Sequence, residues 1–418
     1  MPSLLPDISP LRTSREFRLL WSGQLISQVG SAVRFVALPY QVYLLTGSTF
    51  AVGLLGLFQA VPLIVLSLWG GVIADRVDRR RLLLTTNVGL ALVSVALAIA
   101  TQLDAATLPL LYVLTAVGAG IGALDQPARS ALAPSLVQRR LIPAAMALTQ
   151  TQWQLASVIG PAAAGLLIAQ LGLASAYWID VATFAGATVA LLLMRVPRAD
   201  LTVVHAPPLR ALAEGIAFLW SRPLLLATMS VDFFATFFAV SRAVMPYFAD
   251  RVFAVGPEGL GVLYAAPGVG AAVIALTSGW TAGVSRKGLG ILVAVAVFGL
   301  AIAAFGFLPP TGFLLGLVLL AIAQGADTVS AIFRHTILQL ETPDALRGRL
   351  SAINLVFVAG GPYLGQFESG VVAELLTPEL SVITGGLACV GVVIATQGFV
   401  PQLARYRADL EALPASSG

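Results

Sequence analysis

Charged side chains are scarce in this chain of 418 residues, and their scarcity excludes a water-soluble globule. Asp, Glu, Lys and Arg make up 11% of the residues, whereas hydrophobic residues make up 58%. Soluble domains carry about 25% charged residues. The net charge is only +4 and no basic face lies on a polar helix, so nucleic acid is not expected as a partner.

Cysteine and histidine are nearly absent as well. The one cysteine, Cys389, falls in an apolar run, and the two histidines, His205 and His335, fall in polar connections far apart in the sequence. Disulfides are therefore excluded, and no metal site is expected. The chain also lacks the glycine-rich loop with Lys-Ser/Thr that binds nucleotide phosphates. We expect no cofactor and no enzymatic activity; a membrane-embedded enzyme and a channel are disfavoured alternatives.

Long apolar runs dominate what is present. A membrane-spanning helix needs about 20 predominantly apolar residues. The runs predict an all-α polytopic membrane protein with twelve transmembrane helices, and the first run is too long for a cleaved signal peptide. The expected spans are 17–45, 49–74, 82–102, 107–128, 142–170, 175–195, 223–248, 258–283, 289–308, 312–333, 350–374 and 380–401.

Basic residues fall in alternate gaps between these runs. Only Arg34, Arg242 and Arg251 of the 24 Lys and Arg side chains lie elsewhere. Short loops rich in Lys and Arg stay on the cytoplasmic side of a membrane. The pattern predicts a multi-pass protein of the cytoplasmic (inner) membrane, in contact with lipids and with both termini in the cytoplasm.

The two halves of the chain repeat each other. Pro39-Tyr40 recurs as Pro246-Tyr247, and Gly160-Pro161 recurs as Gly361-Pro362, in the same order and at a near-constant offset. Such a repeat is typical of carriers whose two bundles rock about a central site. The expected organisation is a six-helix bundle at 1–195, a linker at 196–222 and a second six-helix bundle with a tail at 223–418. The linker is expected to hold an amphipathic surface helix at 210–220.

The connection after the second run carries a recognisable motif. It reads Gly-x-x-x-Asp-Arg followed by an arginine cluster, and it resembles the signature loop of the major facilitator superfamily. That superfamily usually has glycine where this chain has Asp78. The resemblance implies two pseudo-symmetric six-helix bundles and a gating role for the loop. The residues concerned are Gly71, Asp75, Arg76, Arg79 and Arg80.

The stretch from Ser157 to Gly165 is similar to a motif of exporters in that superfamily. Pro161 removes a backbone hydrogen bond and Gly160 permits a bend, so both are expected to let the helix flex or pack tightly, as are Gly361 and Pro362. Residues 261–279 and 336–349 resemble enterobactin exporters and macrolide efflux carriers. The resemblance implies export of a siderophore or a similar amphipathic small molecule; multidrug or macrolide efflux and, less favoured, import are alternatives. We expect the protein to be a monomer.

Acidic groups within the spans are candidates for proton coupling. Asp232 lies ten residues past Arg222, about 15 Å into a hydrocarbon core of about 30 Å. A carboxylate at that depth is expected to bind a proton, which suits a proton antiporter; the alternative is a structural aspartate hydrogen-bonded to a neighbouring helix. Glu368 is a second candidate, near the outer interface like Asp180.

Other polar groups are candidates for gating or for the substrate cavity. Arg34, about 24 Å in, either reaches the outer headgroups or belongs to a cationic patch that faces an anionic substrate. Two charge pairs, Asp125 with Arg129 and Asp327 with Arg334, share helical faces and are expected to be structural or gating elements. Amides in a span bridge helices or line a wet cavity. The remaining cavity candidates are Gln24, Gln28, Gln150, Gln152, Trp153 and Gln154.

Overall fold

The computed structural model describes residues 7–195, 214, 216–239, 242–343 and 346–407. Within these ranges the regular structure is helical, and no strand occurs. The first part of the chain contains α1 (Ser9–Thr13), α2 (Arg15–Thr46), α3 (Thr49–Arg76), α4 (Arg79–Gln102), α5 (Leu108–Ser135), η1 (Arg139–Leu141), α6 (Ile142–Leu171) and α7 (Leu173–Leu193).

The second part has the same alternation of long helices and short connections. It contains α9 (Pro223–Ala239), α10 (Met245–Tyr247), η2 (Phe248–Val252), α11 (Gly256–Thr277), η3 (Ser278–Gly283), α12 (Lys287–Gly306), η4 (Pro310–Gly312), α13 (Phe313–Glu341), α14 (Arg347–Leu375), α15 (Pro378–Phe399) and α16 (Pro401–Arg405). The expected surface helix falls mostly outside the described residues, although 216–220 are helical.

Nine helices in the described part of the chain are long and apolar enough to cross a membrane. They are α3 to α7, α11, α12, α13 and α15. The helix α9 is apolar but shorter, and α2 and α14 are not among the nine found in the described residues, which include α14 only in part. The all-α membrane architecture is thereby confirmed, whereas the number of twelve spans stays a prediction.

Local capping explains where several helices begin and end. Ser14 and Asp78 accept hydrogen bonds from the backbone N–H groups of Phe17 and Arg81, at 3.1 and 2.9 Å, and so cap α2 and α4. Gly47 ends α2 in the left-handed region, with a φ of 64° that favours glycine. Asp78 has a φ of −55°, so the turn before α4 does not need the glycine that is usual there.

The chain forms two compact units. One comprises Met1–His205 with Ala243–Gly268, and the other comprises Ala206–Arg242 with Val269–Gly418. The segment 243–268 thus packs with the first unit, although it lies beyond the expected linker. The division into the sequence ranges 1–195 and 223–418 stays a prediction.

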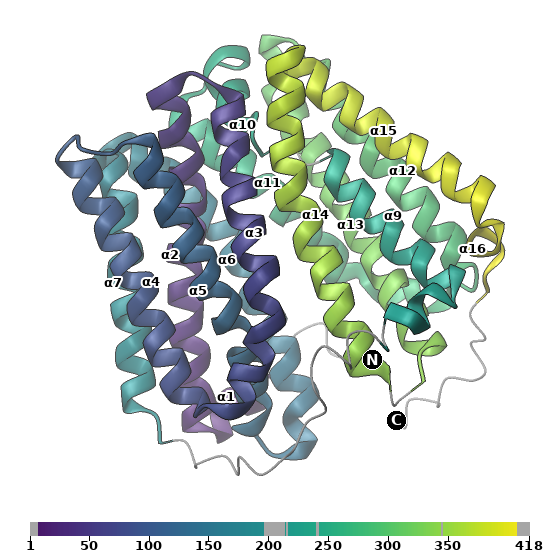
Figure 1. The fold of residues 1–418 in the computed structure, drawn as a ribbon, viewed down its shortest axis with the longest axis horizontal. Coiled ribbons are helices and arrows are strands. Elements are labelled where there is room, and N and C mark those ends of the chain that lie inside the picture. Colours follow the sequence, from purple (N-terminus) through teal and green to yellow (C-terminus); the bar gives the residue numbers. More distant parts are fainter. Residues whose placement is uncertain (1–6, 196–213, 215, 240–241, 344–345, 408–418) are drawn as a thin grey trace. The chain divides into compact units, whose positions relative to one another are not determined.

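Each unit is a bundle of helices (Figure 1). In the first unit α2 packs against α6 and α7, α4 against α5 and α7, and α3 against α5. Buried apolar side chains from five of these helices form a common core, which includes Phe17, Leu83, Leu132, Leu148 and Leu191. In the second unit α12 packs against α13 and α15, and α9 packs against α14.

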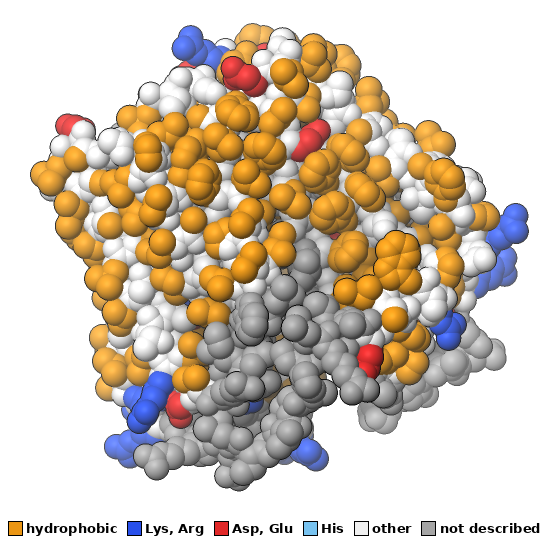
Figure 2. Space-filling model, viewed as in Figure 1, with side chains coloured by type: hydrophobic (Ala, Val, Ile, Leu, Met, Phe, Trp, Pro, Cys, Tyr) orange, Lys and Arg blue, Asp and Glu red, His pale blue; other side chains and the backbone are white. Residues whose placement is uncertain are grey.

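The outward faces of the helices are apolar. Large side chains such as Leu92, Val113, Leu300 and Leu314 are more than half exposed. Figure 2 shows hydrophobic side chains across the middle of the visible face, with Lys and Arg at its margins. An extended apolar surface of this kind suits contact with lipid rather than with water.

Candidate functional site

The second unit contains a buried cluster of one arginine and two carboxylates. Arg334 on α13 forms an ion pair with Asp232 on α9, with Nη2 lying 2.6 Å from Oδ1. The Oδ1 atom of Asp327, also on α13, lies 3.7 Å from the same nitrogen. Arg334 Nη1 donates to the Ser330 hydroxyl at 2.8 Å, and Gln324 Nε2 donates to Asp327 Oδ2 at 2.9 Å. All five residues therefore belong to one polar network between two helices.

Helical spacing brings most of this network together. Ser330 precedes Arg334 by four residues and Asp327 precedes it by seven, which places all three on one face of α13. Asp232 comes from a helix that is distant in sequence. The sequence paired Arg334 with Asp327 alone, but the shorter contact is the one with Asp232.

The network carries more acid than base. The exposed fractions of the Arg334, Asp232 and Asp327 side chains are 12%, 5% and 21%. One guanidinium thus faces two carboxylates in a largely buried setting. An uncompensated buried charge is costly, so the arrangement favours binding of a proton or of a group that brings positive charge or hydrogen-bond donors.

A small cavity adjoins Arg334. Its polar lining comes from Arg334, His335, Thr228 and Asn354, and its apolar lining comes from Met229, Leu338 and Val358. His335 therefore lies within α13 and not in a polar connection as the sequence suggested, because α13 continues to Glu341. His205 falls outside the described residues.

Glu368 on α14 is partly buried. Within the described residues it makes no ion pair or hydrogen bond, and nothing there connects it with the Arg334 network. Its proton-coupling role therefore stays a prediction, with less support than that of Asp232.

The first unit holds a buried ion pair of a different kind. Arg34 Nη1 on α2 lies 3.2 Å from Asp180 Oδ2 on α7, and it donates to the Ser94 hydroxyl on α4 at 2.9 Å. Ser94 in turn donates to Asp180 Oδ2 at 2.6 Å. Here one base faces one acid, and three helices are tied together.

This pair bears on two interpretations of the sequence. Asp180 is 0% exposed, so it is buried among the helices, and its depth near the outer interface stays a prediction. Arg34 is 18% exposed at its side chain and its charge is matched by Asp180, so its role in a cationic patch that faces an anionic substrate stays a prediction with less support. The sequence missed the pairing because its two members lie on helices far apart in the chain.

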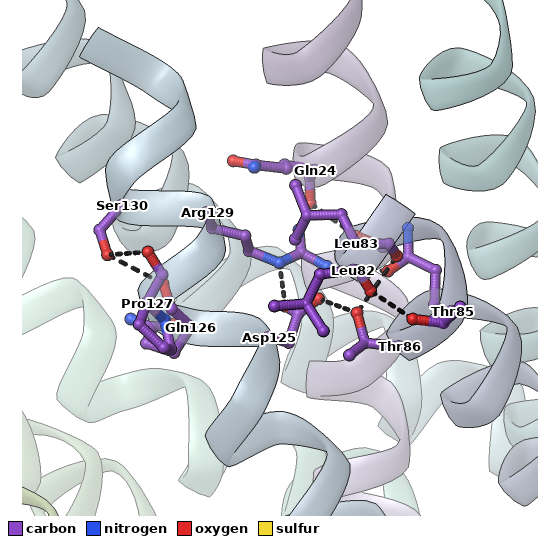
Figure 3. Close-up of polar contacts among 12 residues, drawn as sticks. Gln24, Leu82, Leu83, Thr85, Thr86, Asp125, Gln126, Pro127, Arg129 and Ser130 are labelled. Atoms are coloured by element: carbon purple, nitrogen blue, oxygen red, sulfur yellow. Dashed lines mark hydrogen bonds and ion pairs between the residues drawn. The ribbon is translucent and has the colours of Figure 1, made fainter. Parts of the chain in front are cut away.

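A second network in the first unit joins α4 and α5 (Figure 3). Arg129 forms an ion pair with Asp125 one helical turn away and donates to Asn87 Oδ1 at 2.9 Å. Thr86 donates to Asp125 at 2.6 Å. A small cavity beside Arg129 is lined in part by Asn87 and Gln24, and Gln24 Nε2 is buried without a partner among the described residues. A water molecule would satisfy such a group.

The other cavity candidates have separate environments. Gln152 is fully buried and donates to the Trp21 carbonyl at 3.2 Å, whereas Gln154 donates to the Gly268 carbonyl at 2.9 Å. Gln150 is exposed, and Trp153 is 60% exposed. Gln28 is partly buried, with Oε1 unpartnered in the described part of the chain. The structure does not assemble these residues into one site.

The signature loop connects neighbouring helices through its arginines. Gly71, Asp75 and Arg76 lie at the end of α3, in a stretch whose side chains are outside the described residues. Arg79 Nη1 donates to the Ala131 carbonyl on α5 at 3.3 Å. Arg80 donates from Nε and Nη2 to the carbonyls of the last turn of α7, both at 2.9 Å. Arg80 thereby caps a helix C-terminus with a positive charge.

Gly160 and Gly361 occupy corresponding positions in the repeat and permit the same type of packing. A Cβ atom at Gly160 would lie 3.0 Å from the Val29 carbonyl oxygen of α2, and one at Gly361 would lie 3.2 Å from the Phe233 carbonyl oxygen of α9. Both helices continue through the prolines that follow, Pro161 and Pro362. Glycine is therefore needed here for close approach of the helices.

Sequence reasoning missed a row of aromatic rings beside Asp232. Phe233, Phe234, Phe237 and Phe238 on α9 contact one another, and Phe357 on α14 contacts Phe233. The repeated Phe-Phe pair at a spacing of four was the available signal, because such a spacing gathers side chains along one side of a helix.

Comparisons with known proteins point to membrane transport. The family MFS_3, described as "Transmembrane secretion effector", matches residues 6–413. The chain is 31% identical to the enterobactin exporter EntS of Escherichia coli O157:H7 over 417 residues, which cover 100% of this chain and 99% of the relative. It is also 31% identical to the enterobactin exporter of Escherichia fergusonii, with 97% and 96% covered.

Solved transporter structures share the fold. The nucleoside transporter NupG (D323A mutant) matches with a TM-score of 0.78 at 11% identity, covering 92% of this chain and 100% of that one. A POT family transporter in complex with 5-aminolevulinic acid matches with a TM-score of 0.73 at 13% identity, covering 93% and 97%. At these identities the likeness concerns the fold alone.

Proposed function

Because the chain belongs to the MFS_3 family of transmembrane secretion effectors, we propose that it is a proton-coupled secondary exporter of an amphipathic small molecule. It is a multi-pass membrane transporter of the major facilitator superfamily. The two units are taken to alternate access to a site near the middle of the membrane. We place the chain in the cytoplasmic membrane as a monomer with both termini in the cytoplasm, as the distribution of Lys and Arg indicates.

One observation carries the proton coupling: Arg334 faces two acids, Asp232 and Asp327. Without a proton the network holds a surplus negative charge in a buried place. A proton on one carboxylate removes that charge. In this scheme the protonated carboxylate releases its proton when cargo binds. It binds a new proton when the site is open to the side of the membrane with the lower pH.

The cargo is proposed from the relatives and from the charge of the network. The relatives that match over the full length are enterobactin exporters, so a siderophore of that kind is the first candidate. A macrolide or another drug with a protonated amine is the alternative, because surplus carboxylates also attract a cation. The exporter-like stretch around Gly160 and Pro161 favours export over import.

The proposal is tested with purified protein in proteoliposomes, with enterobactin as the probe. Asp232→Asn keeps the size of the side chain and removes its charge. We expect an imposed pH gradient to drive enterobactin transport in the wild type but not in this variant, while exchange without a gradient continues. The matched control is Asp250→Asn, since Asp250 is an exposed aspartate paired with Arg251. Gradient-driven transport by Asp232→Asn at the wild-type rate would contradict the proposal.

A further inference from the structure

The short helix α16 is docked onto the ends of two longer helices of the second unit. It packs against α12 and α15, and its residue Leu403 is fully buried. A Cβ atom at Gly288, in the first turn of α12, would overlap the Leu403 carbonyl oxygen and would lie 3.2 Å from Cβ of Tyr406. Tyr406 also donates a hydrogen bond to Glu341 Oε1 at the end of α13, at 2.9 Å. These contacts fix the place of α16 beside the first turn of α12.

The docking of α16 brings three arginines to one edge of the second unit. Arg286 directly precedes α12, Arg405 ends α16, and Arg407 follows Tyr406. All three are exposed. Figure 2 shows Lys and Arg side chains at the right margin of the view, where Figure 1 labels α16. We call Arg286, Arg405 and Arg407 the α16 patch.

The charges of the α16 patch are not matched within the described part of the chain. None of its three guanidinium groups makes a hydrogen bond or an ion pair there. In the signature loop, by contrast, Arg79 and Arg80 donate to backbone carbonyls of neighbouring helices. Glu341, the one acid that the end of the described chain contacts, accepts its hydrogen bond from Tyr406. The α16 patch therefore has a surplus of positive charge available to a ligand.

Large apolar side chains next to the α16 patch are exposed. Phe399, which ends α15, is 87% exposed, and Leu289 in the first turn of α12 is 38% exposed. Trp280 is 52% exposed and contacts Phe333 edge to face, and the Lys287 ammonium lies 5.3 Å from the centroid of the same ring. Exposed tryptophan is typical of the boundary between membrane and water. The arginines thus lie where the apolar outer surface of the helices ends.

We propose that the α16 patch is a binding site for the headgroup of an anionic phospholipid. Guanidinium groups donate charge-assisted hydrogen bonds to phosphate oxygens, and basic sites at the ends of transmembrane helices attract anionic lipids. The acyl chains of such a lipid lie along Phe399 and Leu289. A soluble phosphate has the same charge but no apolar part to contact these side chains. The inference is independent of the cargo and of the proton site.

The test measures binding of phosphatidylglycerol to the purified full-length protein in a neutral detergent by native mass spectrometry. Phosphatidylcholine, which has no net charge, is the reference lipid. We expect the triple variant Arg286→Gln, Arg405→Gln, Arg407→Gln to bind phosphatidylglycerol about tenfold more weakly than the wild type, because the attraction of three charges is lost. Its binding of phosphatidylcholine is expected to stay the same. Equal affinity of this variant and the wild type for phosphatidylglycerol would overturn the inference.

A matched control removes the same charge elsewhere. The triple variant Arg12→Gln, Arg139→Gln, Arg140→Gln changes three exposed arginines of the first unit. We expect it to bind phosphatidylglycerol like the wild type. An equally large loss in this control would show that lipid binding follows the total charge of the protein, and the α16 patch would be wrong as a site.

A second variant changes the geometry of the α16 patch and keeps its charge. In Gly288→Ala the new methyl group meets the Leu403 carbonyl and displaces α16, so we expect severalfold weaker binding of phosphatidylglycerol. Gly283→Ala is the matched control, because nothing lies within 4 Å of its Cβ position. Thermal unfolding checks that both variants are folded. Wild-type affinity in folded Gly288→Ala would contradict a site that depends on the docking of α16, and the arginine variant decides if Gly288→Ala does not fold.

Glycerol 3-phosphate separates a lipid site from a site for soluble phosphate. It carries the charged part of the headgroup without acyl chains. We expect it to leave phosphatidylglycerol bound when both are present at the same concentration. Complete displacement at that concentration would assign the α16 patch to a soluble phosphate compound and would overturn the lipid assignment.

Discussion

The two units treat buried charge differently. In the first unit Arg34 faces the single acid Asp180, and Ser94 bonds to both, while Asp180 Oδ1 is buried without a hydrogen-bond partner among the described residues. In the second unit Arg334 faces both Asp232 and Asp327. The first pair is balanced in charge, whereas the second network has one more acid than base; we therefore propose proton exchange for the second alone.

The difference separates structural polarity from functional polarity. Charge within a membrane span is often a sign of function. Arg34 and Asp180 show that a buried charge alone does not indicate function, because their network holds α2, α4 and α7 together. The useful criterion is whether acids and bases within contact distance are equal in number. By that criterion we propose the second unit as the place of the proton site.

The largest effect is expected when the base of the unbalanced network is removed. Arg334→Gln leaves two buried carboxylates without a cation, and loss of one partner of a buried pair costs about 3–5 kcal/mol. The unfolding temperature and the yield of folded protein should both fall sharply. Adding Asp327→Asn removes the surplus acid, and this double variant should recover part of the loss. No recovery would show that Asp327 is electrostatically independent of Arg334.

The balanced pair should behave as a unit in a double-mutant cycle. Arg34→Gln and Asp180→Asn each leave one buried charge unpaired, at about 3–5 kcal/mol. Their combination is expected to cost clearly less than the sum, because neither charge remains. The double variant, once folded, should show the same pH dependence of transport as the wild type. A changed pH dependence would place a proton site in the first unit.

A smaller effect is expected at the close contact between α6 and α11. A Cβ atom at Gly261 would lie 2.6 Å from the Pro161 carbonyl oxygen and 2.7 Å from Gly165 Cα. Gly261→Ala should therefore destabilise the first unit by about 1–3 kcal/mol through overpacking. Gly122→Ala in α5 is the matched control, because nothing lies within 4 Å of its Cβ position. Equal unfolding temperatures of the two variants would argue against a tight contact.

The smallest effect is expected for Glu368. It is only partly buried and lies outside the Arg334 network in the described residues. Glu368→Gln should therefore keep most of the gradient-driven transport measured in proteoliposomes, in contrast to Asp232→Asn. Complete loss of gradient-driven transport in Glu368→Gln would instead assign the proton site to Glu368 on α14.

The sequence predicts local features of this fold well. The apolar runs place the long helices, and a spacing of four predicts that Asp125 and Arg129 share a face, as their ion pair shows. The repeat predicts that Gly160 and Gly361 have similar positions, and both do pack against the helix that begins their half of the chain.

Pairings between distant helices were not accessible from spacing. Nothing in the sequence connects Arg34 with Asp180 or Arg334 with Asp232, because those contacts depend on which helices become neighbours. The phenylalanine pairs of α9 were visible in the sequence, but the contact of Phe233 with Phe357 requires the packing of α9 on α14. For the same reason the spacing of the three glutamines of α6 could not show that Gln152 donates to the Trp21 carbonyl and Gln154 to the Gly268 carbonyl.

The most direct measurement is the number of protons released when cargo binds. Purified protein in weakly buffered solution with a pH indicator is mixed with enterobactin. We expect the wild type to release about one proton per molecule bound, since cargo and proton share the carboxylates of the Arg334 network. Asp232→Asn should release none, whereas the folded Arg34→Gln, Asp180→Asn variant should release as many as the wild type. Unchanged release by Asp232→Asn would contradict the assignment of the proton site to the unbalanced network.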